Sequence, residues 1–227
     1  MPRPPGHRST RTLRRPRRED LGLVRSEFAA LQRLTTPAKI QAFLNALPAN
    51  HEVGGETILS VREVLRQRRA HCIEGAFVAA CALWVHGEAP LVLHMDCDAS
   101  DYPHVVALFR RGGHWGALSK TNGAALRFRD PVYRSLRELS LSYFHEYANR
   151  RGDKTLRSYS GAFDLRRLDP VDWVTAAGAC HAAHDRLERL RHYPLLSPAQ
   201  ERLLTRRDAF EQRVARVVEH PKRGTNG

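Results

Sequence analysis

The fold of this chain is decided by residues 69–84, which read RAHCIEGAFVAACALW. Apolar residues recur there at three- and four-residue steps from Ile73 to Trp84, which predicts a helix with an apolar face. Most of the remaining positions are alanine, so such a helix is narrow enough to be surrounded by other elements. We therefore predict a central helix buried in the core, with Cys72 in its first turn.

Cys72 stands where a helix favours a negatively charged sulfur. The first turn has N–H groups without helical partners and the positive end of the helix dipole. Both stabilise the thiolate, which is the nucleophilic form of cysteine. A base is available in His104, which opens the strand-like run 103–110. Free cysteines more often act as small buried hydrophobes, and Cys81, in the middle of the same helix, is interpreted in that way. Residues 60–86 contain no proline, so propensity alone also allows a helix that runs through Cys72.

Length and charge indicate how many domains the chain forms and which partners it could bind. The 227 residues, 42% of them hydrophobic, suit one domain with extensions or two small domains. Lys and Arg number 37 against 24 for Asp and Glu, a formal charge of +13, and seven arginines lie within residues 1–20. We expect this Pro/Arg-rich tail to be disordered and to contact anionic polymers weakly.

Cysteine usage and hydropathy predict the compartment. Four cysteines in a chain of this length do not make a disulfide framework. The longest uninterrupted apolar run, residues 76–85, is too short to span a bilayer. The beginning of the chain lacks the apolar segment that secretion requires. We therefore expect no membrane partner and a reducing, cytoplasmic location.

Helical patterns lie on both sides of a group of strands. Thr36-Pro37 and Ser60 with Glu63 match helix starts. Strands are expected at residues 90–95, 104–109, 115–119 and 125–129, with Asn122-Gly123 as a hairpin turn before the last. Helices are expected from Ser135 to Tyr147, from Asp169 through Leu190, and from Ser197 with Leu203, Phe210, Val214 and Val217 inside. The order predicts an α+β fold with a basic tail at 1–20, a core at 21–165 and a helical extension at 166–220.

The region from Thr35 to about Leu165 resembles the bacterial transglutaminase-like domains of the papain-like cysteine protease superfamily. Three segments carry the resemblance: HCIEGA at 71–76, DYPHV at 101–105 and HWGALSKTN at 114–122. The resemblance implies a papain/transglutaminase-like core, in which the central Cys-bearing helix packs on an antiparallel sheet, with helical extensions at both ends.

The resemblance also implies a Cys-His-Asp triad. In that chemistry a thiolate attacks an amide or other acyl carbonyl, and the resulting thioester is resolved by water or an amine. A histidine takes and returns the proton, and a third residue orients its ring. Cys72 and His104 match the first two positions. The implied function is a peptidase, amidase or acyltransferase that acts on a protein, peptide or amine substrate without a cofactor.

The third position departs from the family. Relatives usually carry an aspartate a few residues after a tryptophan, and counting from Trp115 that place is Ser119 here. Asp130 has the better chemistry because a carboxylate stabilises an imidazolium, and Asn122 has a precedent in papain-like enzymes. We place Asp130 slightly ahead of Asn122. Trp115 is a candidate to shield the thiolate or a core residue, and Lys120 either binds an anionic substrate group or is exposed on a turn, which we favour.

The sequence also suggests three functional hypotheses other than a thiol enzyme. A metal site is suggested by His94, Cys97 and His104 and by His181 and His184, but only His94-x-x-Cys97 approaches zinc spacing, so we predict no metal. Nucleic-acid binding is suggested by the charge, although the arginines are scattered and no recognition motif is present. A catalytically inactive binding module of the same fold is consistent with the uncertain third residue.

Overall fold

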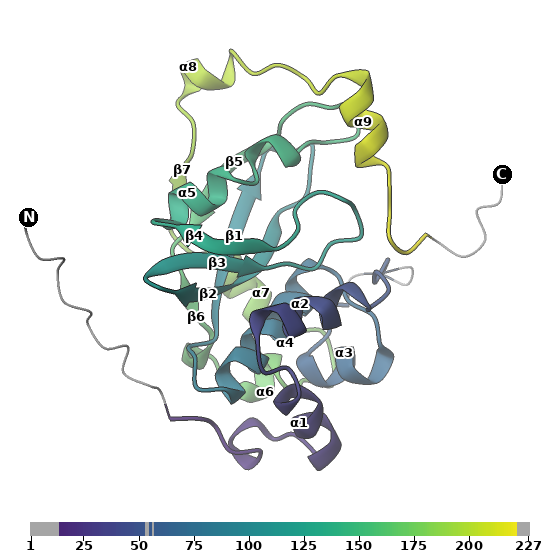
Figure 1. The fold of residues 1–227 in the computed structure, drawn as a ribbon, viewed down its shortest axis with the longest axis vertical. Helices are drawn as coiled ribbons and strands as arrows, with labels where there is room; N and C mark the ends of the chain where they lie inside the picture. Colours follow the sequence, from purple (N-terminus) through teal and green to yellow (C-terminus); the bar gives the residue numbers. More distant parts are fainter. Residues whose placement is uncertain (1–13, 53–54, 56, 222–227) are drawn as a thin grey trace, which may run out of the picture.

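The computed structural model describes residues 14–52, 55 and 57–221. In this part of the chain the fold is α+β, with one seven-stranded antiparallel sheet and helices packed against it (Figure 1). The strands are β1 (Leu91–Cys97), β2 (His104–Arg111), β3 (His114–Leu118), β4 (Arg129–Tyr133), β5 (Leu156–Ser160), β6 (Phe163–Asp164) and β7 (His192–Pro194). Their order is β4-β3-β2-β1-β5-β7, and β6 also pairs with β1.

The helices lie before, between and after the strands. They are α1 (Arg25–Gln32), α2 (Pro37–Asn45), α3 (Val61–Gln67), α4 (Cys72–Val85), α5 (Leu136–Leu141), α6 (Pro170–Trp173), α7 (His181–Glu188), α8 (Pro198–Glu201) and α9 (Ala209–Ala215). Short 3-10 turns are η1 (Glu19–Leu21), η2 (Phe144–Glu146) and η3 (Leu165–Arg167). Within the described residues, no helix combines the length and the apolar character needed to cross a membrane.

The sheet separates two hydrophobic cores, and the alternation along β2 shows how. Val105, Ala107 and Phe109 belong to the core that α4 fills, and Val106 and Leu108 belong to the core beneath α5. Successive side chains of a strand point to opposite faces, so a strand that is apolar at every position must be covered on both sides. This arrangement fixes β2, which begins with His104, in the middle of the molecule.

Helix α4 begins at Cys72 and ends at Val85, as the sequence predicts. Every residue from Ile73 to Val85 except Trp84 is buried. The start is determined by Glu74, whose carboxylate accepts the backbone N–H of His71 at 2.7 Å. A carboxylate at the third helical position that returns to the residue before the helix is half of a capping box. This hydrogen bond therefore places the start of the helix at Cys72, which helix propensity alone does not determine.

The two predicted helix starts before α4 are confirmed. The Thr36 hydroxyl accepts the backbone N–H of Lys39 at 3.2 Å at the start of α2. The Ser60 hydroxyl accepts the N–H of Glu63 at 3.4 Å at the start of α3. Both bonds satisfy a donor that the helix itself leaves free. Helices α2 and α3 both contact α4.

The fourth strand lies further along the chain than the sequence predicts. We expected it at 125–129, but β4 runs from Arg129 to Tyr133 and includes Pro131, which an edge strand tolerates. Asn122-Gly123 does not form a tight hairpin, and residues 119–128 make a longer connection. The reason lies in Asn122, whose side chain bonds the backbone of His220 in both directions, at 2.9 and 3.0 Å.

The segment 166–220 is more than a helical extension. The long helix expected from Asp169 is broken into α6 and α7, and β7 then joins the sheet through the pairing of Tyr193 with Tyr159. The prediction of buried apolar side chains in the last helix is wrong. Leu203, Phe210, Val214 and Val217 are exposed, because the C-terminal segment with α9 lies on the surface rather than inside a core (Figure 1).

The basic tail falls partly outside the described residues, since the structure describes it only from residue 14 onward. Where the sequence predicts disorder up to residue 20, Pro16 is buried and η1 begins at Glu19. Residues 15–18 lie beside Phe28 and Val85 around a shallow hollow. The described part of the tail is therefore packed against α1 and the end of α4.

Candidate active site

The first turn of α4 and the start of β2 meet at a cavity of about 360 Å³. Cys72 and His104 both line it, so the structure brings together the two residues that the sequence singles out. The cavity is also lined by His71, Lys120, Asn122, Leu126 and Glu146. Cys72 is the first residue of α4, and its own N–H has no partner within the helix.

The half-buried thiol of Cys72 lies between two imidazoles. Its Sγ is 3.9 Å from Nδ1 of His71. Burial alone would raise the pKa of the Cys72 thiol, but hydrogen bonding to His104 and His71 and their charges lower the pKa well below its ordinary value. A lowered pKa favours the thiolate, which is the nucleophilic form of the thiol.

His104 is oriented by Ser119. Nε2 of His104 lies 2.8 Å from the Ser119 hydroxyl, which in turn lies 2.5 Å from the carbonyl oxygen of Leu126. A carbonyl only accepts, so the hydroxyl donates its proton to Leu126 and accepts the N–H of His104 at Nε2. This leaves Nδ1 as the nitrogen of His104 that can exchange a proton with the thiol.

The three candidates for the third position differ in their contacts with His104. Ser119 is the residue that bonds His104. Asp130, which the sequence analysis places first, is exposed on the edge strand β4 and does not line the cavity. Because Arg129 already pairs with Ala117 and β4 runs antiparallel to β3, Asp130 lies back along β3, away from Ser119. Asn122 lines the cavity, but its amide is engaged by the backbone of His220.

Ser119 is held rigidly by a residue that sequence reasoning missed. Gln41 on α2 accepts the N–H of Ser119 at 3.0 Å and donates to its carbonyl oxygen at 2.8 Å. The carbonyl of Leu126 is fixed as well, because its own N–H bonds the Glu146 carboxylate at 2.7 Å. Leu126 has a φ of 59°, a left-handed conformation that is unfavourable for leucine. The only sequence signal for Gln41 is a polar side chain among the apolar positions of α2.

His71 is the second residue whose role the sequence did not show. The side chain of His71 is largely buried, and its Nε2 lies 3.2 Å from Oε1 of both Glu74 and Glu52. Burial alone would lower the pKa of His71, but hydrogen bonds to Cys72 and Glu74 and the charges of both raise the pKa to about 10. His71 is therefore an imidazolium at neutral pH, beside the sulfur of Cys72.

Glu74 anchors this imidazolium from inside the core. Its side chain is fully buried, and it accepts hydrogen bonds from Asn50, Thr57 and the N–H of Leu59 in addition to His71. Burial alone would raise the pKa of Glu74, but the bond to His71, the His71 charge and backbone N–H donors lower it overall. A buried carboxylate with this many donors stays ionised and holds its partner in place.

Lys120 is buried, and the expectation that it would be exposed on a turn is wrong. Only 1% of the residue is accessible, and its Nζ donates to the carbonyl oxygen of Leu47 at 2.5 Å. Burial lowers the pKa of Lys120 to about 8. The stem of Lys120 crosses α4 at Gly75, where a Cβ would lie 2.4 Å from Cβ of Lys120. Gly75 thus lets the Ser119–Lys120 segment approach the helix.

Trp115 does not line the cavity. Its half-buried ring packs against the core beneath α5 and lies under the guanidinium of Arg110, 4.7 Å from it. This agrees with the alternative reading of Trp115 as a core residue and gives it no part in shielding the thiolate.

The other three cysteines are set apart from Cys72 by their surroundings. Burial raises the pKa of Cys81, in the interior of α4. Burial and nearby carboxylates raise the pKa of Cys97 and of Cys180 to about 12. Cys72 is the only one of the four thiols with a lowered pKa.

Two groups of side chains in the described part of the chain have the spacing of cation ligands. Glu52, His71 and Glu74 form one, and His184, Asp185 and Glu188 on α7 form the other. In the first, the His71 imidazolium occupies the place between the carboxylates. His94, which the sequence analysis considered as a ligand, pairs its Nδ1 with Nε2 of His192 at 2.8 Å. We therefore assign no cofactor role to these groups.

Comparison with known proteins adds no identification to this geometry. No model of a protein family matches the chain, and no curated protein is significantly similar to it.

Proposed function

We propose that this protein is a thiol enzyme of the transglutaminase-like kind, which attacks an amide or other acyl carbonyl through a thioester on Cys72. The observation that carries the proposal is the Cys72 thiol at the first residue of α4, with a lowered pKa between His71 and His104. The antiparallel sheet behind this helix is compatible with the papain/transglutaminase-like core that the sequence resembles.

The proposed reaction begins with the Cys72 thiolate. Its electron pair forms a C–S bond to the carbonyl carbon, and the C–O π electrons move to the oxygen, which becomes an oxyanion. The Cys72 N–H, without a helical partner, is a donor for this charge. The oxyanion then re-forms the carbonyl and expels the amine, which takes the proton that His104 received from the thiol.

The second half of the reaction regenerates the thiol. Water or a primary amine attacks the thioester carbon and loses its proton to His104, and the C–S bond breaks to release Cys72. The Ser119 hydroxyl fixes the tautomer of His104 throughout, because it accepts only from Nε2–H. His71 stays protonated, so it stabilises the thiolate without exchanging the catalytic proton.

The proposal is tested with iodoacetamide and p-nitrophenyl acetate on the native protein. A limiting amount of iodoacetamide should modify Cys72 before the other cysteines at pH 6, and His104→Ala should reduce this preference. With p-nitrophenyl acetate we expect a burst of p-nitrophenolate stoichiometric with protein, and an acetyl group on Cys72 by mass spectrometry. Cys72→Ser removes both signals, and Cys97→Ser serves as the matched control. Slow, uniform labelling without a burst would instead support a catalytically inactive binding module.

A further inference from the structure

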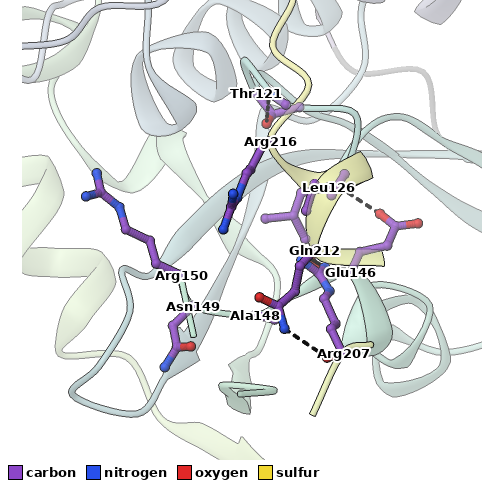
Figure 2. A pocket seen from close by; sticks show the side chains of 12 residues that line it. Thr121, Leu126, Glu146, Ala148, Asn149, Arg150, Arg207, Gln212 and Arg216 are labelled. Atoms are coloured by element: carbon purple, nitrogen blue, oxygen red, sulfur yellow. Dashed lines mark hydrogen bonds between the residues drawn. The ribbon is translucent and has the colours of Figure 1, made fainter. Parts of the chain in front are cut away.

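A second cavity, of about 480 Å³, adjoins the one that contains Cys72 (Figure 2). The two share Thr121, Leu126, Glu146 and Ala148 as lining residues. The second cavity is closed on its other side by the end of α9, which contributes Gln212, Ala215 and Arg216. A molecule with its carbonyl at Cys72 can therefore extend into the second cavity without leaving the surface of the protein.

The charge around this cavity is strongly positive. Arg150, Arg207 and Arg216 line it, against Glu146 as the single acidic side chain. Glu146 is already neutralised, because its carboxylate lies 2.8 Å from Arg129. The guanidinium of Arg207 donates to the backbone carbonyls of His145 and Glu146, so its charge has no counterion there.

Arg150 and Arg216 are the two cations that remain available to a ligand. Both are exposed, and neither forms an ion pair with another described residue. Figure 2 shows their side chains on the side of the cavity that faces away from the Glu146 carboxylate. A guanidinium binds a carboxylate through paired N–H donors. The two arginines are therefore the lining residues whose guanidinium groups are open to an anionic group.

Apolar side chains make up another part of the lining, beside the uncharged polar residues Thr121, Asn149 and Gln212. The apolar residues are Ala125, Leu126, Ala148 and Ala215. Such apolar side chains accommodate a short aliphatic stem. Together with the arginines, they match an acidic side chain, in which methylene groups end in a carboxylate.

We propose that this second cavity is a substrate subsite that binds the acidic side chain of a peptide or protein whose neighbouring acyl group is attacked by Cys72. The inference rests on the proposed function, because it assigns the subsite to the same reaction. It specifies the substrate class as an acidic polypeptide and gives Arg150 and Arg216 the role of specificity-determining residues.

The test uses two matched peptide probes, iodoacetyl-Gly-Glu-Glu-amide and iodoacetyl-Gly-Gln-Gln-amide, and the second-order rate constant for alkylation of Cys72 by each. The ratio of the acidic to the amide probe is measured for the wild type, Arg150→Gln, Arg216→Gln and the double variant. An exposed ion pair changes a binding constant by about 1.4- to 5-fold. Each single variant should lower the ratio by about that factor and the double variant by about the product.

Two controls separate charge at the subsite from charge in general. Arg134→Gln removes the same charge from an exposed site outside the cavity and should leave the ratio unchanged. Raising the ionic strength should lower the wild-type ratio toward that of the double variant, since exposed charges are screened. Circular dichroism confirms that each variant is folded.

The outcomes distinguish the two proposals. If plain iodoacetamide does not single out Cys72, the thiol-enzyme proposal fails. If Cys72 is reactive but both probes react equally fast in the wild type, only the acidic subsite is overturned. A preference for the acidic probe that survives the double variant overturns the assignment to Arg150 and Arg216.

Discussion

His71→Gln should raise the pKa of the Cys72 thiol while leaving His104 and Ser119 in place. The imidazolium lies 3.9 Å from Sγ. At this separation two unit charges interact by about 4 kcal/mol with an effective dielectric constant of about 20, and by about 2 kcal/mol with one of about 40. One pKa unit corresponds to about 1.4 kcal/mol, so the expected rise is about 1.5 to 3 units. Glutamine keeps the backbone N–H that Glu74 accepts but has no charge.

The assay is the rate of iodoacetamide alkylation at Cys72 from pH 4 to pH 10, followed by mass spectrometry of the Cys72 peptide. The midpoint of this profile is the pKa of the thiol. His114→Gln, at the first residue of β3, is the matched control and should leave the midpoint unchanged. A wild-type midpoint near the ordinary thiol value, or a shift of less than about half a unit in His71→Gln, would refute the assignment of His71 as the cation that stabilises the thiolate.

Three further predictions concern residues around the site. Ser119→Ala should slow the acetyl burst by about tenfold or more, because His104 loses the partner that fixes its tautomer, while the midpoint of Cys72 alkylation moves little; an unchanged burst rate would contradict this. Gly75→Ala should destabilise the fold by about 1 to 3 kcal/mol, seen as a lower midpoint of thermal unfolding, because its Cβ overlaps that of Lys120. Lys120→Met should remove a pH dependence of the free energy of unfolding. The folded wild type releases the lysine proton near pH 8 and the unfolded chain near pH 10.5, so the unfolded state binds more protons between these two values. In urea titrations the free energy of unfolding of the wild type should therefore rise by up to about 3 kcal/mol relative to the variant across this interval.

Much of the fold follows from local signals that the sequence states clearly. Helix starts at Thr36 and Ser60 depend on one side chain and one backbone donor three residues away. Strands β1 to β3 are apolar runs next to each other in the chain, and they pair as consecutive neighbours. The edge of the sheet could not be predicted in this way. Strand β7 is a His-Tyr-Pro tripeptide whose pairing with β5 depends on the packed sheet already being present.

The candidate site likewise contains residues that local sequence signals predict and residues that depend on contacts distant in the sequence. Cys72 and His104 are placed by elements that the sequence predicts, a helix start and a strand start. The third residue depends on register, because Asp130 and Ser119 both follow β3 and only the real length of the connection shows which one reaches His104. Gln41 and His71 act through contacts with residues far away or through buried partners, and residue type alone does not reveal such contacts.

The buried carboxylate of Glu74 supports His71, whereas His104 is supported by the hydroxyl of Ser119. Ser119 orients His104 with a neutral hydroxyl, which fixes the ring without favouring its protonated form. In the proposed mechanism the His71 imidazolium adds a fixed positive charge beside the thiolate, and Glu74 inside the core keeps His71 protonated. In the proposed mechanism, orientation of the base and stabilisation of the nucleophile are therefore separate tasks of separate histidines. This division is consistent with a serine beside His104: in the proposed mechanism His104 takes the thiol proton and returns it to the leaving group, while His71 supplies a positive charge that stays in place throughout.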